Sequence, residues 1–415
     1  MEYKKRLLEK QLDLLLEVFP IISVTGPRQS GKSTMLENYA GNKWQYFNLD
    51  NRTVRLRVSQ DPDLFVRDFQ SNVIIDEAQK VPDLFHSIKE IIDKGYSYKI
   101  ILSGSANFLL MQSITESLAG RVGILELHPY SIAESLNIKP TGYIHDFLDS
   151  KSIEALFKKL SAKKHIDENK LLDFILEGGF PKIHNLKSSN AKLQWFQNYI
   201  TTYIEKDLRD IGNITDLESF QIVYNLLAYQ AGKLLNISNI ASDIGLTLNT
   251  IKKYISILET SYQYKKLFPF KLGYKEKITK SPKVYGFDSG MINYLIKNFD
   301  RDRMLNSGYW GAILENWLFI ELYKVIKDLV PRPQLHFYRT RNDAEVDFVI
   351  EHGKKLIPIE VKTSCYIKPI DLRGLKSFMN SYSKFEIPYG LVIHRGEKVS
   401  WLDDKILGIP LTIIY

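Results

Sequence analysis

A phosphate-binding pattern near the start of the chain places the strongest limit on its fold. Residues 26–33 read Gly-Pro-Arg-Gln-Ser-Gly-Lys-Ser, which satisfies every fixed position of G-x-x-x-x-G-K-[ST]. An apolar, β-branched run, residues 21–25, precedes the pattern, and a run with helical spacing, residues 34–40, follows it. Glycines there let backbone N–H groups turn toward phosphate oxygens at a helix N-terminus. The sequence therefore predicts a strand, a phosphate-binding loop and a helix.

The residue types of this loop predict a site for a magnesium-bound nucleoside triphosphate. We expect Lys32 to reach the β- and γ-phosphates and Ser33 to ligate Mg²⁺. The predicted nucleotide-binding set is Gly26, Pro27, Arg28, Gln29, Ser30, Gly31, Lys32, Ser33 and Thr34. A glycine-rich turn without a ligand is the alternative, and the flanking strand and helix argue against it.

Two carboxylates follow the next strongly apolar run, residues 73–75. We expect Asp76 to hold magnesium through water and Glu77 to polarise the attacking water. The alternative is that the two carboxylates only mark a strand end that is exposed to solvent. A further predicted strand, residues 99–102, leads into small polar residues. Ser103 and Asn107 are candidates to sense the γ-phosphate or orient water, although such residues also cap helices.

Composition adds limits of a general kind. At 415 residues the chain is too long for one hydrophobic core, and 44% hydrophobic with 25% charged residues is ordinary for a globular protein. No apolar run reaches the roughly 18 residues that span a bilayer, and charged residues interrupt the leucines of the N-terminus. Cys365 is the single cysteine, which excludes an internal disulfide framework. We expect a multidomain, cytoplasmic protein without a membrane segment.

The order of apolar runs predicts the domain organisation. Short strand-like runs alternate with helical stretches up to about residue 130, which is the pattern of an α/β sheet with helical crossovers. Helical spacing then dominates, and mixed α/β patterning returns near residue 284. The predicted units are a P-loop ATPase domain (1–130), a helical lid and connector (131–215), a winged helix (216–283) and an α/β domain (284–415).

Two motifs give the N-terminal domain a family resemblance. Residues 76–82 read D-E-A-Q-K-V-P and residues 118–121 read L-A-G-R. Together with the phosphate-binding loop, they resemble prokaryotic AAA-type ATPases. The resemblance implies ATP and Mg²⁺ as cofactors, ATP hydrolysis and a homo-oligomer. It also implies that Arg121 acts at the γ-phosphate, in its own subunit or across an interface, although a surface arginine would look the same.

A helix-turn-helix pattern lies in the middle of the chain. Two short helical runs, residues 238–244 and 248–258, flank Gly245, and an aromatic, basic segment suited to a wing follows them. Residues 252–283 contain nine lysines and two acidic residues, so most of the net charge of +8 lies there. This favours DNA or RNA as a partner, although winged helices also dock proteins. The candidate phosphate contacts are Thr250, Lys252, Lys253, Lys265 and Lys266.

Carboxylates in the last third of the chain suggest a second metal site. Asp347 lies in a predicted strand, residues 345–350, and the next strand ends in Glu360-Val-Lys362. Strand alternation places Glu360 and Lys362 on one face, so Asp347 and Glu360 can bind magnesium while Lys362 positions the attacking water. Glu315, on a predicted helix, is an outer-shell candidate. Surface ion pairs are the alternative for this loose pattern.

The C-terminal motifs also resemble a known arrangement. Residues 281–290, 311–316 and 359–362 look like the uncharacterised domain that usually follows this ATPase domain, and that domain is thought to be related to restriction endonucleases. The resemblance implies a nuclease-like fold and leaves cleavage open. ATP-dependent engagement of nucleic acid by the C-terminal half is the leading hypothesis. An ATP-gated protein-interaction switch with an inactive nuclease-like domain is the alternative.

Overall fold

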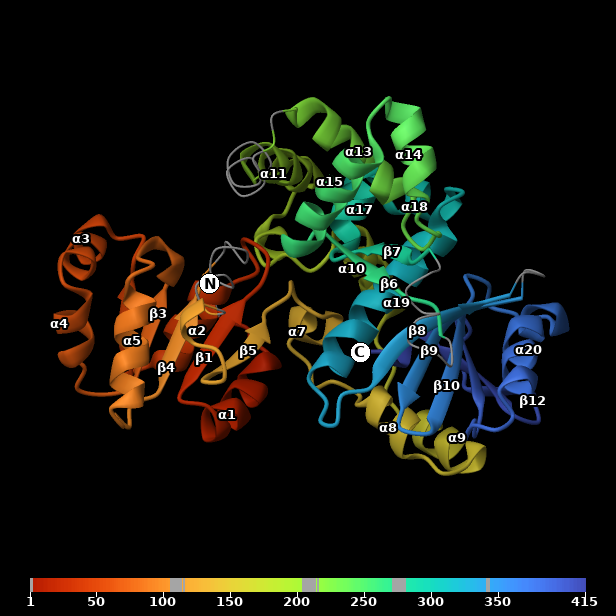
Figure 1. The fold of residues 1–415 in the computed structure, drawn as a ribbon. Helices are drawn as coiled ribbons and strands as arrows, with labels where there is room; N and C mark the ends of the chain where they lie inside the picture. The colour runs from red at the N-terminus through yellow and green to blue at the C-terminus, as the bar shows by residue number, and fades with distance from the viewer. Residues whose placement is uncertain are drawn as a thin grey trace.

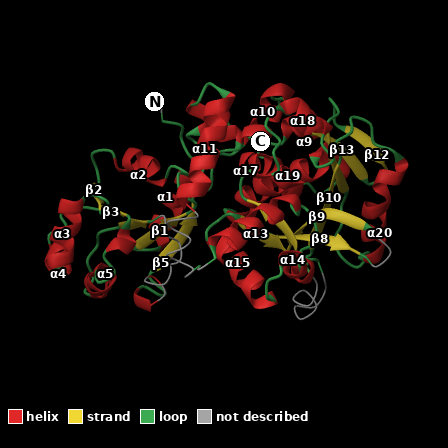
Figure 2. Ribbon diagram, turned by 90° about the horizontal axis from the view of Figure 1, so that it is seen from above, coloured by secondary structure: helices red, strands yellow, loops and turns green. Residues whose placement is uncertain are grey.

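The computed structural model describes residues 3–104, 114, 116–203, 214, 216–270, 281–340 and 344–415. Figure 1 shows three regions: an N-terminal α/β region at the left, a group of helices at the top, and a C-terminal sheet at the right. Seen from above, α11 (Ser189–Thr202) lies between the N-terminal α/β region and the other helices of the middle region (Figure 2). Asn107 lies outside the described residues.

The N-terminal sheet has five parallel strands in the order β2-β3-β4-β1-β5. β1, β3 and β4 lie at or within one residue of the runs predicted at 21–25, 73–75 and 99–102. β1, β3 and β4 are buried along their whole length, as expected for strands covered on both faces. The strands are β1 (Ile21–Thr25), β2 (Gln45–Asn48), β3 (Val73–Asp76), β4 (Ile100–Ser103) and β5 (Val122–Glu126).

Helices cover both faces of this sheet and create two apolar cores. Leu12 and Met35 belong to the core under α1 and α2, whereas Leu84 and Ile88 belong to the core under α5. Each helix buries the face that its apolar spacing defines. The helices of this region are α1 (Leu8–Val18), α2 (Lys32–Ala40), α3 (Arg52–Gln60), α4 (Pro62–Arg67) and α5 (Leu84–Asp93).

The middle of the chain is helical, as predicted. The two helices of the predicted helix-turn-helix are α14 and α15, separated by Gly245 in the left-handed conformation (φ 75°), and Thr247 caps the second. The helices are α7 (Ile132–Leu136), α8 (Tyr143–Asp149), α9 (Ile153–Ser161), α10 (Glu168–Glu177), α11, α13 (Leu217–Tyr229), α14 (Ile237–Ile244), α15 (Leu248–Thr260), α17 (Ser289–Leu295) and α18 (Arg301–Asn306).

A two-stranded antiparallel sheet follows α15. β6 (Tyr264–Leu267) pairs with β7 (Lys283–Gly286), with Tyr264 opposite Gly286 and Leu267 opposite Lys283. The sequence assigned the second of these strands to the C-terminal α/β region. Among the described residues it pairs with β6 instead, because its side chains are buried against α19 (Trp310–Lys327), where the ring of Tyr285 stacks 4.3 Å from that of Phe319.

The C-terminal sheet has six strands in the order β12-β13-β11-β10-β9-β8. β10, β11 and β13 run parallel, whereas the other pairs are antiparallel. The sequence did not predict β12 and β13, the two strands nearest the C-terminus, because each is short. α19 and α20 (Arg373–Ser381) accompany the sheet. The strands are β8 (Gln334–Arg339), β9 (Glu345–His352), β10 (Lys355–Val361), β11 (Gly390–His394), β12 (Ser400–Asp403) and β13 (Ile406–Pro410).

A β-bulge interrupts the pairing of β8 with β9. Tyr338 lies opposite Val346, whereas His336 lies opposite Val349, so β9 holds one extra residue between them. Val346 and Val349 pack in the core with α20, while Phe348 packs in the core with α19. The bulge therefore falls beside Asp347, and bulges of this kind re-aim neighbouring side chains.

The helical region and the C-terminal sheet share one apolar core. A single cluster of buried side chains begins at Ile132 and includes residues of α13, α15, β7, α19 and the C-terminal strands. The predicted domain boundaries at residues 215 and 283 therefore lie within this shared core. The division of the chain into separate domains at these residues remains a prediction. None of the described helices combines the length and apolar character needed to cross a membrane.

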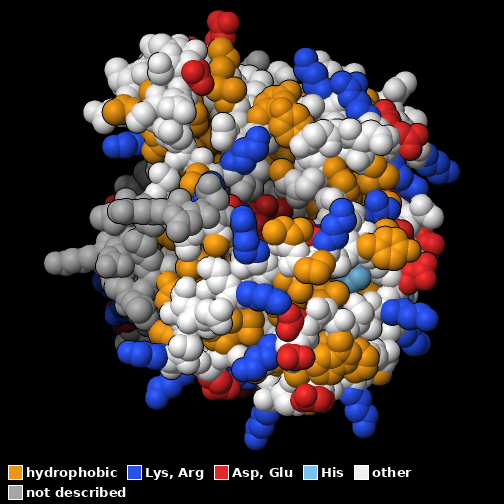
Figure 3. Space-filling model, turned by 90° about the vertical axis from the view of Figure 1, so that its right-hand side faces the viewer, with side chains coloured by type: hydrophobic (Ala, Val, Ile, Leu, Met, Phe, Trp, Pro, Cys, Tyr) orange, Lys and Arg blue, Asp and Glu red, His pale blue; other side chains and the backbone are white. Residues whose placement is uncertain are grey.

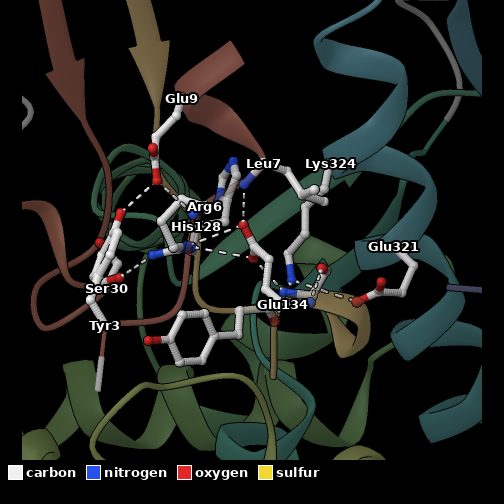
Figure 4. A network of polar contacts seen from close by, with 11 residues as sticks. Tyr3, Arg6, Leu7, Glu9, Ser30, His128, Glu134, Glu321 and Lys324 are labelled. Atoms are coloured by element: carbon white, nitrogen blue, oxygen red, sulfur yellow. Dashed lines mark hydrogen bonds and ion pairs between the residues drawn. The ribbon is translucent and has the colours of Figure 1, made fainter. Parts of the chain in front are cut away.

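The guanidinium of Arg6 joins the start of the chain to both halves of the molecule (Figure 4). It is buried, donates to Glu134 Oε1 (3.1 Å) and the Ser30 carbonyl (2.8 Å), and also donates to the His128 carbonyl. Glu134 in turn accepts from the backbone N–H groups of Leu7 and Ser131, at 2.8 Å each. Both carboxylate oxygens of Glu134 therefore accept hydrogen bonds, and each nitrogen of the guanidinium donates one, as a buried ion pair requires.

We predict that Arg6→Met destabilises the protein by about 3–5 kcal/mol, because it leaves the carboxylate of Glu134 buried without its cation. The measurement is urea and thermal unfolding. Lys5→Met is the matched control, since the Lys5 side chain is 74% exposed and its contact with Glu9 is 3.9 Å long. Equal stability of Arg6→Met and Lys5→Met would contradict this prediction.

Candidate nucleotide and carboxylate sites

The predicted phosphate-binding loop lies where the sequence placed it, between the carboxyl end of β1 and the start of α2. Two of its glycines are required by geometry. Gly26 has φ 138°, and a Cβ added to it would lie 2.1 Å from the carbonyl oxygen of Leu127. Gly31, with φ 94°, is the residue before the first helical residue, Lys32. A side chain at either position would strain the loop.

Lys32 is buried beneath this loop. Its ammonium donates to the carbonyl oxygens of Gly26 (3.0 Å) and Pro27 (2.9 Å). Burial lowers the pKa of Lys32 to about 8, against the opposing attraction of Glu77 and Asp76. The ammonium therefore has neutral oxygens as its hydrogen-bond acceptors, although the two carboxylates are near enough to influence it. Phosphate oxygens would be stronger acceptors for the same group.

Asp76 ends β3 in a set of directed hydrogen bonds. Its Oδ2 accepts from the Tyr46 hydroxyl (2.9 Å), and its Oδ1 accepts from the Ser103 hydroxyl and from the backbone N–H of Glu77 (3.1 Å). The Ser33 side chain slightly opposes the rise in the pKa of Tyr46. The hydroxyl of Tyr46 thus bonds one of the two residues expected to hold Mg²⁺, Asp76, and lies near the other, Ser33. Burial, and next the charge of Asp76, raise the pKa of Tyr46.

Glu77 turns away from the strand in the left-handed conformation, with φ 57°. Its Oε2 accepts from the Gln79 side chain at 2.6 Å. Glu77, Lys32, Asp76 and Ser103 all lie at the carboxyl edge of the parallel sheet, where ligands bind in open α/β folds. These donor types and positions fit Mg²⁺ and a triphosphate.

The remaining loop residues differ in exposure. Ser30 is buried, Arg28 and Ser33 are partly exposed, and Gln29 and Thr34 are exposed. Gln29 has a positive φ of 58°. The loop is therefore open to solvent at its tip and closed at its base.

Arg121 lies at the opposite edge of the sheet. It precedes Val122, which pairs with Ile21, the first residue of β1, so one strand length of about 13 Å separates it from the phosphate-binding loop. Its guanidinium makes two hydrogen bonds with Asp93, of 2.7 and 3.0 Å. The sequence left open whether Arg121 acts at the nucleotide of its own subunit or across an interface. Its position in the structure suits the first alternative poorly.

Residues from outside the N-terminal sheet contact the loop and the end of the strand that precedes it. Trp195 of α11 donates to the Gln29 side chain at 3.1 Å. Tyr262, between α15 and β6, lies 2.9 Å from the hydroxyl of Thr25, the last residue of β1. Arg6 bonds the Ser30 carbonyl. Residues from three distant segments therefore hold the ends and middle of one loop.

The predicted nucleic-acid contacts divide into two groups. Lys252 and Lys253 are exposed on α15, and Thr250 hydrogen-bonds Thr247 at the start of that helix. Lys265 and Lys266 lie on β6 and face Glu259, at 3.9 and 3.1 Å. The second pair is thus partly neutralised.

The predicted C-terminal residues come together, but around a lysine. Glu360 lies on β10 next to Ile359, whose partner Phe348 follows Asp347, so Asp347 and Glu360 are cross-strand neighbours. Asp347 Oδ2 accepts from the Val361 N–H (2.9 Å). Lys362 donates to Glu360 Oε1 (2.7 Å).

Lys283 occupies the centre of this cluster. Its ammonium lies 2.9 Å from Glu315 Oε1, 2.6 Å from Glu345 Oε1 and 3.5 Å from Asp347 Oδ1. Burial lowers its pKa, but Tyr285 and the surrounding carboxylates outweigh this, so the pKa is well above its usual value. Burial, and then the charge of Asp347, raise the pKa of both Glu315 and Glu360.

This arrangement places a lysine within the expected second magnesium site, which remains a prediction. No group of three or more metal-ligating side chains that could hold an ion occurs in the part of the chain that the structure describes. Of the two expected ligands, Asp347 lies 3.5 Å from the ammonium of Lys283, and Glu360 accepts from Lys362. Glu315, expected in an outer shell, instead accepts from Lys283 and from the Tyr285 hydroxyl (2.6 Å).

Sequence reasoning missed several of these residues. Tyr46, Trp195 and Arg6 belong to no motif, and their roles depend on partners far away in the chain. Lys283 was counted with the basic segment. Its position at the start of the apolar run Val284-Tyr285 was the one signal that it is buried.

Three family models match separate parts of the chain. Residues 18–136 match the family described as AAA domain. Residues 168–302 and 310–414 match two families described as domains of unknown function, DUF8612 and DUF4143. The match supports the AAA-type P-loop assignment that the motifs predicted for the N-terminal part of the chain, whereas the winged-helix and nuclease-like assignments remain predictions.

Relatives extend over most of the chain. The uncharacterized protein Rv2008c of Mycobacterium tuberculosis is 25% identical over 393 residues, covering 94% of this chain and 80% of its own. The uncharacterized protein MJ1544 of Methanocaldococcus jannaschii is 25% identical over 371 residues, covering 86% and 78%. Among solved structures, the Walker-type ATPase PABY2304 of Pyrococcus abyssi aligns with a TM-score of 0.48 at 14% identity, covering 71% of this chain and 96% of that one.

The lowered pKa of Lys32 predicts a pH dependence of nucleotide affinity. Phosphate stabilises the ammonium, so the pKa of Lys32 rises when ATP binds. The affinity for ATP is therefore constant below about pH 8 and falls above it, by up to about tenfold per pH unit. Isothermal titration with ATP between pH 6.5 and 9.5 measures this. Lys32→Arg is the control, since its charge persists throughout; the same slope in both proteins would exclude Lys32 as the titrating group.

Proposed function

We propose that this protein binds and hydrolyses Mg²⁺-ATP at the carboxyl edge of its N-terminal sheet. The observation that carries the proposal is that Asp76, oriented by Tyr46 and Ser103, lies at the same edge of the sheet as Ser33 and the buried ammonium of Lys32. An oxygen pair of this kind suits Mg²⁺, and the lysine suits the β- and γ-phosphates.

Each residue of the site has a distinct part in this reaction. Lys32 exchanges its bonds to the loop carbonyls for bonds to phosphate oxygens. Asp76, oriented by Tyr46 and Ser103, holds the metal through water, and Glu77 accepts a proton from the attacking water. The left-handed backbone of Glu77 turns its carboxylate out of the strand, where Gln79 steadies it.

Nucleotide occupancy also changes the contacts between the two halves of the protein. The loop that would meet the phosphates is also held by groups outside the nucleotide site, because Gln29 is bound by Trp195 and the Ser30 carbonyl by Arg6. A loop that moves on binding phosphate therefore moves groups bonded to α11 and to the chain start. This contact supports the proposal of a nucleotide-dependent switch.

We predict that Lys32→Ala abolishes ATP binding, whereas Glu77→Gln retains binding and loses turnover by about 100-fold or more. Only the second change removes the group that acts on water. Fluorescent-nucleotide binding and phosphate release, each with Mg²⁺, measure the two effects separately. Wild-type ATP affinity in Lys32→Ala would refute the assignment of the loop.

The position of Arg121 suits a role at the nucleotide of a neighbouring subunit better than a role within its own subunit. It lies at the far edge of the sheet from its own nucleotide site, partly exposed and held by Asp93. In a ring or filament, that edge can face the nucleotide of a neighbouring copy. We therefore propose homo-oligomerisation on ATP binding, with Arg121 contributed in trans.

Engagement of DNA or RNA is the second candidate function. The observation in its favour is the exposure of Lys252 and Lys253 on the second helix of the helix-turn-helix. On the face drawn in Figure 3, by contrast, basic side chains are interspersed with acidic and hydrophobic ones. The proposal therefore rests on α15.

We predict that Lys252→Gln together with Lys253→Gln lowers the salt dependence of nucleic-acid binding by about 1.5 in the slope of log K against log salt, since two phosphate contacts are lost. Fluorescence anisotropy with labelled duplex DNA and single-stranded RNA, at several salt concentrations, measures the slope. Lys265→Gln with Lys266→Gln is the matched pair with a small expected effect, because Glu259 already faces both lysines. An unchanged slope in the first pair would favour the protein-interaction switch.

A further inference from the structure

Lys283 is among the most deeply buried charged groups of the C-terminal half. Its side chain is 2% exposed, and it approaches three carboxylates through one nitrogen: Glu315 (2.9 Å), Glu345 (2.6 Å) and Asp347 (3.5 Å). The three acids come from two elements of the C-terminal body, α19 and β9. The lysine comes from β7, a strand of the separate two-stranded sheet.

Neighbouring groups hold Lys283 in this position. Tyr285, two residues along β7 and on the same face, donates to Glu315 Oε1 (2.6 Å) and stacks on Phe319 of α19. The backbone of β7 is fixed at Gly286, whose N–H donates to the Asn316 side chain (2.7 Å). The hairpin therefore cannot withdraw Lys283 without breaking contacts with the buried helix.

The carboxylates need a cation at this point. Buried carboxylates this close together repel one another strongly unless a positive charge lies among them. A nuclease-like fold would supply a divalent metal, bound at about 2.0–2.6 Å by the same oxygens. The Lys283 nitrogen already lies among these oxygens, so the side chains present do not fit a metal here.

One acceptor of the cluster is left over. Glu360 is 8% exposed, and its Oε2 has no hydrogen-bond partner among the described residues, while its Oε1 accepts from Lys362. An unused buried acceptor beside Asp347 is a further ligand for any cation that replaces the ammonium.

We propose that Lys283 is an internal cation that takes the place of a metal ion in the C-terminal carboxylate cluster. The wild-type protein then binds no divalent metal there, and the ammonium fastens the β6–β7 hairpin to the C-terminal sheet. The cluster is a cryptic metal site that opens when Lys283 is removed. This inference does not depend on the ATPase proposal.

The test is divalent-metal binding by the full chain without nucleotide. Every protein carries Asp76→Asn, so that the nucleotide site contributes no signal. Mn²⁺ binding is measured by electron paramagnetic resonance and isothermal titration. We expect no binding in this background, about one Mn²⁺ per chain after adding Lys283→Met, and loss of that ion on further adding Asp347→Asn. Lys266→Met, on the neighbouring strand, is the matched control and should bind none.

Two results would overturn the proposal. One is Mn²⁺ bound at this cluster, and lost with Asp347→Asn, while Lys283 is present. The other is a folded Lys283→Met protein that binds no Mn²⁺ and is not stabilised by it in thermal unfolding. If Lys283→Met does not fold, Glu315→Gln and Asp347→Asn are added to remove the uncompensated charge. Recovery of folding would support the proposal, and continued failure to fold would contradict it.

Discussion

The buried ion pair between Arg6 and Glu134 is the interaction on which the arrangement of the molecule depends. A guanidinium has five donors in a rigid fork, and here they bind a carboxylate, the phosphate-binding loop at Ser30 and the connector at His128. Lys324 of α19 reaches the same connector through the Tyr130 carbonyl, at 2.9 Å. The N-terminal sheet and the C-terminal body are thus joined by polar groups that are costly to leave unpaired. Such a junction favours one relative arrangement over its alternatives.

Two buried lysines show how the surroundings set the use of one side chain. Lys32 donates to two neutral carbonyl oxygens, and burial lowers its pKa, so an incoming phosphate improves its environment. Lys283 is surrounded by carboxylates, which raise its pKa, so it has no need of a ligand. The first lysine suits binding, whereas the second suits permanent neutralisation. Their difference supports an active nucleotide site in the N-terminal domain and a C-terminal domain that acts by contact.

Contacts between the two halves give the nucleotide site a mechanical connection. Trp195 and Tyr262 belong to segments that pack in the apolar core shared by the helical region and the C-terminal sheet. Trp195 hydrogen-bonds the phosphate-binding loop at Gln29, and Tyr262 hydrogen-bonds the last residue of β1, Thr25. A change at the loop therefore requires a change at α11 or at the turn before β6. The exposed lysines of α15 lie about two helical turns before the end of that helix, which leads into the segment of Tyr262. This continuity connects the proposed ATPase with either a nucleic acid or a protein partner.

Local patterns in the sequence determined the N-terminal fold and most of its site. The strand, glycine loop and helix around Lys32, and the strand ending in Asp76, follow from short-range rules, because backbone geometry and strand-edge chemistry depend on neighbours in the chain. The helix-turn-helix helices follow for the same reason. The sequence could not decide that β7 pairs with β6, that Arg121 lies at the edge of the sheet opposite the phosphate-binding loop, or that Lys283 lies within the carboxylate cluster. Those outcomes depend on which distant segments pack together, and only tertiary structure decides whether a lysine meets water, phosphate or three buried acids.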